Sequence, residues 1–208
     1  MGSDALALPC SRAGEVETGR RRPARRPIPC YNAAKSSAAH GLDVITHSAA
    51  STRRLGQRLG QRLRGGDVVL LSGDLGAGKT TFVQGIAAGL GVDGPVGSPT
   101  FTLINEYDGR DAAGAALTLC HVDLYRLAGG GVETLGLDDY LGAPDTVAVV
   151  EWPQLAPAAL PATALVVEFT ILSETKRRVT LRARGPGAAC YEDRLSALRQ
   201  ELYGAAAR

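Results

Sequence analysis

Hydrophobic and polar residues follow one another along the chain in two spacings, one typical of strands and one typical of helices. Segments of strand length occupy residues 44–46, 67–72, 101–107, 117–122, 146–150, 165–171 and 178–181. Apolar residues that recur every three or four positions predict helices over residues 55–63, 82–90 and 191–202. Strands and helices that succeed each other in this way indicate an α/β domain.

The polar and glycine-rich stretches between these segments predict caps, loops and turns. Ser48 or Ser51 is expected to cap the first helix, because a hydroxyl before an apolar stripe accepts from the first backbone N–H groups. Residues 108–115 predict a loop and residues 132–141 short helical turns. The two last strand segments, joined by residues 173–177, predict a hairpin at a sheet edge.

Composition divides the chain into three parts. Residues 1–41 mix Pro, Arg, Ala and Gly without periodicity and predict a disordered basic extension; an organelle transit peptide is the alternative. Residues 42–184 carry the strand and helix pattern of one domain. Residues 185–208 form a tail with an amphipathic helix, whose apolar stripe we expect to pack on the domain core.

Charge and cysteine content exclude some classes of protein. The 208 residues carry a formal net charge of +2, and by itself this balance indicates neither a nucleic-acid nor a membrane surface. The four cysteines form no C-x-x-C pair, so neither a zinc site nor a disulfide framework is indicated. No apolar run has the length of a membrane span. We therefore expect a cytoplasmic protein without membrane contact.

The segment Gly73–Thr80 carries the clearest chemistry. It fits the pattern G-x-x-x-x-G-K-[ST] at each fixed position, directly after a predicted strand and before a predicted helix. Glycines in such a loop allow successive amide N–H groups to turn around phosphate oxygens at the positive end of the helix. Lys79 would then reach the β- and γ-phosphates, and Thr80 the magnesium ion.

Two further apolar strands each end in one carboxylate, Asp123 and Glu151. Ligands of open α/β sheets bind at the carboxyl ends of the strands, so both acids are expected near the nucleotide. One of them would complete a Mg²⁺ site with Thr80, and the other would position water. As an alternative, Asp123 caps a turn and Glu151 merely precedes a proline. Residues 98–102 are a candidate switch near the γ-phosphate, or else a turn that opens the next strand.

Four segments that occur together and in order carry a resemblance to a known family: Gly73–Phe82, Ser98–Thr102, His121–Arg126 and Val150–Pro153. This set closely resembles TsaE, formerly YjeE, the bacterial ATPase subunit of the machinery that makes threonylcarbamoyladenosine on tRNA. The likeness covers roughly residues 44–181 and excludes the basic extension and the last helix.

The resemblance implies a P-loop NTPase of the α/β class, with a mainly parallel central sheet flanked by helices and antiparallel edge strands. It implies a Mg²⁺-dependent ATPase with low turnover in the absence of its partners. Those partners would be TsaD and TsaB, which transfer a threonylcarbamoyl group to adenosine 37 of tRNAs that read codons beginning with A. The chain would meet tRNA only indirectly, through that complex.

The resemblance also implies roles for single residues. ATP would contact Asp74, Leu75, Gly76, Ala77, Gly78, Lys79, Thr80 and Thr81, with a weaker assignment of Lys176. Thr80 and Glu151 would bind Mg²⁺, and Lys79 and Asp123 would support hydrolysis. The switch would comprise Ser98, Pro99, Thr100 and Thr102. Trp152 would lie beside the metal carboxylate, or else serve as a core aromatic.

Three other classes of P-loop protein compete with this interpretation. A small-molecule kinase, which would transfer the γ-phosphate of ATP, needs an arginine-bearing lid, and the sequence has no clear lid insertion. A GTPase needs the guanine-reading motif N-K-x-D, which is absent from the sequence. A binding module that holds nucleotide without turnover remains open, and a hydrolysis assay would separate it from an ATPase.

Overall fold

The computed structural model describes residues 41–127 and 131–204, and the predicted basic extension therefore lies outside the described residues, Gly41 apart. The chain forms the following strands and α-helices: β1 (Leu42–Thr46), α1 (Ala49–Gly60), β2 (Val68–Ser72), α2 (Lys79–Gly89), β3 (Ile104–Arg110), β4 (Ala116–Asp123), β5 (Thr146–Glu151), β6 (Ala164–Ile171), β7 (Arg177–Arg184) and α3 (Ala189–Tyr203). Short 3-10 turns follow β4 and β5, at Tyr125–Leu127, Val132–Leu135, Leu137–Asp139, Pro153–Leu155 and Pro157–Ala159.

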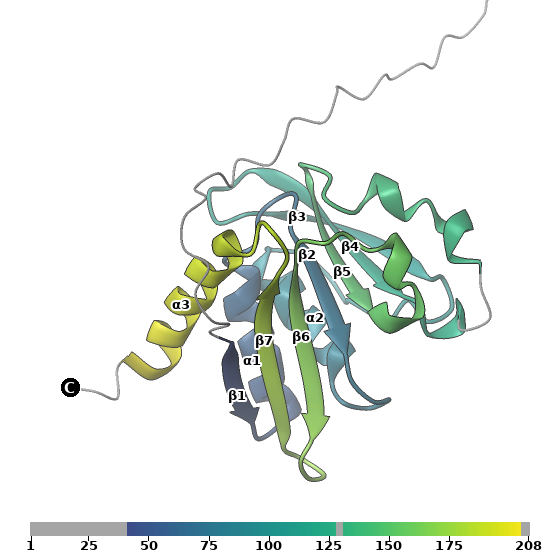
Figure 1. The fold of residues 1–208 in the computed structure, drawn as a ribbon. Coiled ribbons are helices and arrows are strands. Elements are labelled where there is room, and N and C mark those ends of the chain that lie inside the picture. The colour runs from purple at the N-terminus through teal and green to yellow at the C-terminus, as the bar shows by residue number, and fades with distance from the viewer. Residues whose placement is uncertain (1–40, 128–130, 205–208) are drawn as a thin grey trace, which may run out of the picture.

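The strands form one seven-stranded sheet in the order β1-β7-β6-β2-β5-β4-β3 (Figure 1). Its centre is parallel, because β2 pairs in parallel with both β5 and β6, and β4 pairs in parallel with β5. Antiparallel pairs flank this centre, β3 with β4 on one side and β6, β7 and β1 on the other. The predicted α/β class and its mixed sheet are confirmed. The predicted hairpin is present, but β1 lies outside it as the edge strand.

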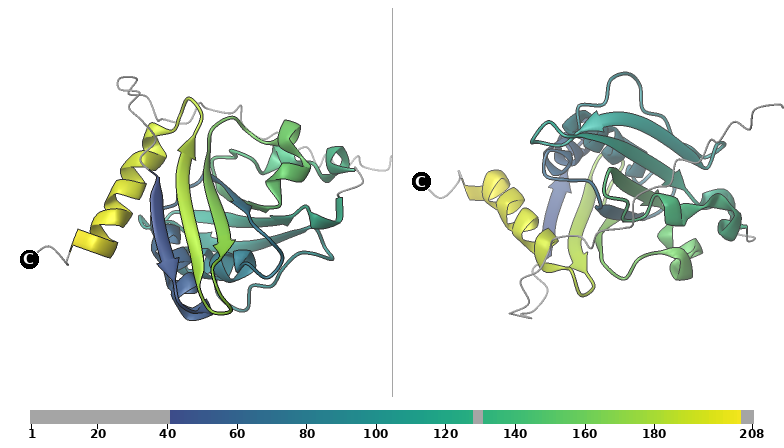
Figure 2. Two further views of the ribbon diagram at one scale, coloured as in Figure 1. Left: turned by 60° about the horizontal axis from the view of Figure 1, so that its bottom comes forward. Right: turned by 90° about the horizontal axis from the view of Figure 1, so that it is seen from above.

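The two faces of the sheet carry separate apolar cores. One core joins α1, α2 and α3 to the sheet, with fully buried side chains such as Leu59, Phe82 and Leu198. The other joins the 3-10 turns to the opposite face through residues such as Leu124, Val150 and Leu137. In both views of Figure 2, α3 and the 3-10 turns lie on opposite sides of the molecule.

Helices α1 and α2 approach each other through glycines. A Cβ on Gly56 would lie 2.2 Å from the carbonyl oxygen of Phe82, and one on Gly85 would lie 2.1 Å from that of Arg53. Ser48 caps α1 and forms a reciprocal capping box with Ser51, so both candidate caps contribute. This close crossing fixes the position of α2, whose first residue is the loop lysine.

Both ends of β3 and the end of α1 differ from the sequence prediction. The strand expected from residue 101 begins at Ile104, because Leu103 has a positive φ of 67° and donates its N–H to Pro99 O at 2.6 Å, which closes a turn. The strand then continues to Arg110 in register with β4, which reduces the expected loop 108–115 to residues 111–115. Helix α1 ends at Gly60, although the next apolar residue of its stripe, Leu63, is buried.

The C-terminal helix α3 packs on the domain, as its apolar stripe predicts. Its residues Tyr191, Leu195 and Leu198 are buried in the helical core. At its start, Arg194 pairs with the buried carboxylate of Asp67, and the Tyr191 hydroxyl accepts the backbone N–H of Val68 at 3.0 Å. Helix α3 is thereby joined to the strand that leads into the glycine loop. Within the described ranges, no helix is long and apolar enough to cross a membrane.

Candidate functional site

The glycine loop joins the end of β2 to the start of α2. Gly76 and Gly78 have positive φ angles of 75° and 101°, and Gly78 precedes the helix without a side-chain cap. Gly73 also has a positive φ, and a Cβ there would lie 2.7 Å from the carbonyl oxygen of Phe169. The first N–H groups of α2 are therefore left for an external acceptor, and the loop fits an anion such as phosphate.

Lys79 lies inside this loop. Its Nζ donates to the carbonyl oxygens of Gly73 and Asp74 at 2.8 and 3.0 Å, and lies 3.9 Å from the ring centroid of Trp152. Burial lowers the pKa of the Lys79 ammonium, while the carboxylates of Glu151, Asp123 and Asp74 oppose that change. The side chain is thus a partly desolvated cation at the mouth of an anion cradle.

A hydroxyl and a carboxylate meet beside the lysine. Thr80 Oγ1 donates to Glu151 Oε1 at 2.9 Å, although the two residues are far apart in the sequence. Both side chains offer hard oxygen atoms, which are the donors that Mg²⁺ prefers, together with phosphate oxygens and water. No group of three or more His, Cys, Asp or Glu residues that could hold a metal by itself occurs in the described part of the chain. The Thr80–Glu151 pair thus offers two hard oxygen donors, and a Mg²⁺ ion there would take further ligands from phosphate or water.

Asp123 ends the neighbouring strand, in register with Glu151. Its Oδ2 accepts the hydroxyls of Thr100 at 2.6 Å and Ser98 at 3.3 Å, and its Oδ1 accepts the backbone N–H of Tyr125 at 3.0 Å. The structure thus joins the candidate switch to one of the two predicted acids. Asp123 also caps the turn that follows it, which was the alternative interpretation.

The other two switch residues bond within their own turn. Pro99 O accepts the N–H of Leu103, and Thr102 Oγ1 donates to Asn105 Oδ1 at 2.7 Å. Among the described residues, neither Pro99 nor Thr102 has a hydrogen bond to the Asp123 carboxylate. Phe101, which lies between them and is 82% exposed, stacks beneath the guanidinium of Arg126 at 4.1 Å from the ring centroid.

Trp152 contacts both the core and Lys79. It has a positive φ of 61°, and its N–H donates to Leu71 O at 3.1 Å, so the chain turns sharply at the end of β5. Its ring packs on the core beneath the 3-10 turns and lies 5.0 Å from the ring of Tyr125. The same ring carries the Lys79 ammonium on its face, which places it in the site as well as in the core.

Two neighbouring basic residues of the β6–β7 turn differ in their contacts with the glycine loop. Lys176 is exposed in the β6–β7 turn, whereas the Arg177 guanidinium donates to Gly76 O of the loop at 3.3 Å. Arg177 also lines a cleft of about 340 Å³ between the hairpin, the start of α1 and the glycine loop; the other lining residues are Ser48, Ala49, Thr52, Gly76, Gly78, Thr81, Glu174 and Thr175. Neighbouring basic residues look alike in a sequence, so the sequence alone did not distinguish Arg177 from Lys176.

His121 was not predicted as a site residue. It belongs to the segment His121–Arg126, but it lies in an apolar strand and carries no spacing signal of its own. The structure buries it completely and places its Nε2 2.9 Å from Glu151 Oε1.

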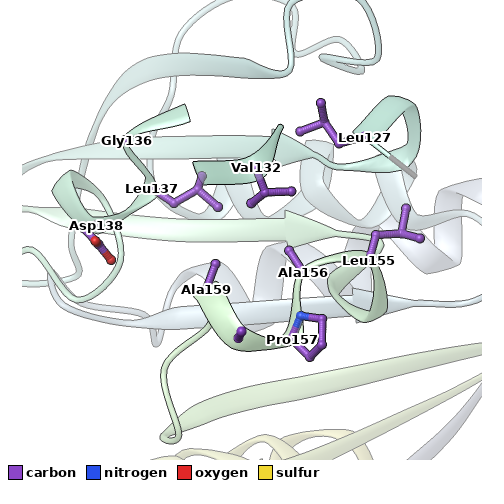
Figure 3. Close-up of a pocket in the computed structure, with 10 residues that line it drawn as sticks. Leu127, Val132, Gly136, Leu137, Asp138, Leu155, Ala156, Pro157 and Ala159 are labelled. Atoms are coloured by element: carbon purple, nitrogen blue, oxygen red, sulfur yellow. The ribbon is translucent and has the colours of Figure 1, made fainter. Parts of the chain in front are cut away.

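A cavity of about 550 Å³ lies beneath the 3-10 turns (Figure 3). Leu127, Val132, Leu137 and Leu155 line it with alanines, and of its described lining residues only Asp138 is ionisable. This apolar cavity contains none of the predicted site residues, and it does not suit a phosphate group.

Comparisons with known proteins agree with this geometry. The sequence profile of the TsaE family, described as threonylcarbamoyl adenosine biosynthesis protein TsaE, matches residues 46–179. The chain belongs to the TsaE family. The match spans the glycine loop, the switch and both strand-end acids, so the resemblance carried by those motifs is confirmed. TsaE proteins are P-loop NTPases, and the predicted P-loop fold class is confirmed with it.

Individual TsaE proteins resemble the chain over most of their length. The protein called tRNA threonylcarbamoyladenosine biosynthesis protein TsaE in Treponema pallidum is 38% identical over 147 residues, which are 67% of this chain and 99% of that protein. The protein of the same name in Nostoc is 43% identical over 135 residues, 63% of this chain and 79% of that protein. The crystal structure of Bacillus subtilis YdiB superposes with a TM-score of 0.65 at 34% identity, covering 80% of this chain and 99% of that one.

Proposed function

We propose that the chain binds ATP with Mg²⁺ and hydrolyses it as the TsaE subunit of tRNA threonylcarbamoyladenosine biosynthesis. The observation that carries the proposal is the contact of Thr80 Oγ1 with Glu151 Oε1 at the mouth of the glycine loop. In P-loop proteins the loop hydroxyl and a strand-end carboxylate together hold the magnesium ion of the nucleotide. The family match supports the same conclusion.

The loop residues would bind the phosphates. The N–H groups at the start of α2 would donate to phosphate oxygens, and Lys79 would exchange its two carbonyl acceptors for the β- and γ-phosphates. Thr80 and Glu151 would hold Mg²⁺, which when bound neutralises charge that develops on the phosphates. This exchange would draw the Lys79 ammonium away from the Trp152 ring.

Asp123 would orient the attacking water, and the switch would control when it does so. In the structure, Thr100 and Ser98 donate to the same oxygen of Asp123, Oδ2. A γ-phosphate that attracted the switch hydroxyls would release that oxygen for water. Nucleotide binding and the activation of Asp123 would then be linked.

The cleft beside the loop would hold the nucleoside. Its lining from α1, the loop and the hairpin turn adjoins the phosphate cradle directly, and Arg177 connects the hairpin to Gly76. We assign the basic nucleotide contact proposed for Lys176 to Arg177 instead, since the latter contacts the loop.

The partners proposed for the chain are TsaB and TsaD, with tRNA reached only through their complex. Hydrolysis would support repeated cycles of threonylcarbamoyl transfer by TsaB and TsaD. A cytoplasmic location, expected from the sequence, remains a prediction.

The proposal is tested by measuring ATP hydrolysis with and without purified TsaB and TsaD. We expect slow hydrolysis by the chain alone and clear stimulation by the pair, dependent on Mg²⁺. Phosphate transfer from ATP to a small metabolite with no effect of the pair would indicate a kinase instead. ATP binding without any turnover would indicate a binding module.

A further inference from the structure

His121 connects the helical core to the proposed metal carboxylate. Because side chains alternate along a strand, those of Leu119, His121 and Asp123 lie on the same side of β4. The residue is fully buried, and its Nε2 lies 2.9 Å from Glu151 Oε1. Its other ring nitrogen, Nδ1, is a buried polar atom with no hydrogen-bond partner among the described residues.

This contact fixes the position of a proton on the ring. An ionised carboxylate only accepts hydrogen bonds, so the proton must be on Nε2 for the contact to form. Nδ1 then faces its apolar surroundings unpaired, which is costly for a buried polar atom. A leucine at this position would avoid that cost, so packing alone does not account for a histidine here.

The geometry of the carboxylate shows what the histidine contributes. Thr80 Oγ1 and His121 Nε2 both donate to Oε1 of Glu151, each at 2.9 Å. Both hydrogen bonds that the described residues donate to this carboxylate end on one oxygen, which they hold between Thr80 and His121. Oε2 is left for the metal or its bound water.

We propose that His121 is a positioning residue that orients the Glu151 carboxylate for Mg²⁺. This inference rests on the proposed function, because it assigns a partner to the same metal site. Removal of the hydrogen-bonding partner of a metal ligand typically lowers metal affinity by about 10- to 100-fold. His121 does not itself touch nucleotide, metal or water in this account.

The test compares two replacements of different hydrogen-bonding capacity. His121→Leu fills the space without a donor, whereas His121→Gln carries an amide N–H close to the position of Nε2. Cys120→Ala, on the opposite side of β4, is the matched control. ATP affinity is measured by calorimetry at increasing Mg²⁺ and in the presence of a chelator, with thermal unfolding as the check on folding.

In the presence of the chelator, we expect His121→Leu to bind ATP with the affinity of the parent. In the Mg²⁺ titration, it should need about tenfold more Mg²⁺ than the parent to reach half of the maximal gain in ATP affinity. His121→Gln should recover most of this loss, and Cys120→Ala should match the parent. If His121→Leu does not fold, His121→Asn replaces it, because its shorter amide does not reach Glu151.

Two results would overturn the inference while leaving the proposed function intact. One is a folded His121→Leu chain with the Mg²⁺ requirement of the parent. The other is an equal rise in the Mg²⁺ requirement of the His121→Leu and His121→Gln variants. If His121 only filled space, a hydrogen-bond donor at this position would not restore the Mg²⁺ requirement of the parent. A parent chain that binds no ATP would overturn the proposed function and this inference together.

Discussion

At the scale of single residues, Glu151 and Asp123 lie side by side but make different contacts. Glu151 accepts the Thr80 hydroxyl, whereas Asp123 accepts the switch hydroxyls. We predict that Glu151→Gln raises the Mg²⁺ concentration needed for ATP binding about tenfold or more, because one metal ligand loses its charge.

Asp123→Asn should lower the hydrolysis rate about 100-fold with little change in ATP affinity. Magnesium titrations and single-turnover assays measure both effects, and identical profiles for the two variants would contradict the assignment.

The residues that the sequence could predict are those of contiguous motifs. The glycine loop depends on local backbone conformation and on the start of one helix, and its eight positions could be recognised without a structure. His121 and Arg177 depend instead on contacts between segments, with Glu151 and Gly76 respectively. Such contacts follow from strand register and turn geometry, which a single sequence does not give.

At the scale of elements, the crossing of α1 and α2 determines where the loop lysine begins its helix. We predict that Gly85→Ala destabilises the domain, because the added Cβ would lie 2.1 Å from the carbonyl oxygen of Arg53. Alanine gains about 1 kcal/mol in helix propensity, but overpacking between rigid backbones costs about 1–3 kcal/mol or more. Thermal unfolding should show a midpoint several degrees lower.

The control for this variant is Gly97→Ala, where an added Cβ meets nothing within 4 Å and φ is not positive. Its unfolding midpoint should equal or slightly exceed that of the parent. If Gly85→Ala were as stable as Gly97→Ala, the close crossing of the two helices would be refuted.

The attachment of α3 to β2 predicts a dependence of stability on pH. Burial raises the pKa of Asp67 above its ordinary value of 3.8, and Arg194 opposes that rise. Arg194→Met removes the opposing charge, so the pKa of Asp67 in the folded state should rise further. When the pKa of Asp67 is higher in the folded chain than in the unfolded chain, this residue contributes stability at low pH. That contribution is lost as the pH rises through the pKa of the folded state.

We therefore predict that Arg194→Met loses about 2 kcal/mol relative to the parent at pH 7.5, and that the loss shrinks toward pH 4.5. Denaturant unfolding at the two pH values measures this difference. Adding Asp67→Asn to the variant should remove the change with pH. A loss that is equal at both pH values, or that grows in acid, would show that the pair does not act in this way.

The elements were easier to predict than their arrangement. The apolar runs that became β2, β4 and β5 are buried on both faces, so their sequence pattern is strong. The place of β1 outside β7 arises from an antiparallel pairing between residues far apart in the chain, such as Val44 with Val179. The start of β3 depended on the positive φ of Leu103, a conformation that leucine rarely adopts and that its sequence does not indicate.

At the scale of the whole molecule, we predict that residues 1–40 are dispensable for activity. The family match begins at residue 46 and β1 at Leu42, so the cut spares the sheet. A few basic residues give only salt-sensitive contacts with nucleic-acid phosphates and do not read sequence. Chains lacking residues 1–40 should therefore retain partner-stimulated hydrolysis and should restore tRNA modification in a strain without this subunit. A truncated chain that folds and binds ATP, yet fails to restore modification, would make the extension a docking element.

The proposal that the glycine loop drives ATP hydrolysis in support of tRNA modification can be tested in a reconstituted reaction. The quantity measured is the amount of threonylcarbamoyladenosine formed per TsaB–TsaD complex, with ATP and excess tRNA, when the parent chain or Lys79→Ala is added. Lys79→Ala should fold like the parent, because among the described residues the Lys79 side chain bonds only to loop carbonyls and stacks on Trp152. We predict many products per complex with the parent and about one with Lys79→Ala, which lacks the charge that stabilises phosphoryl transfer. Equal multiple turnover with both chains would contradict it.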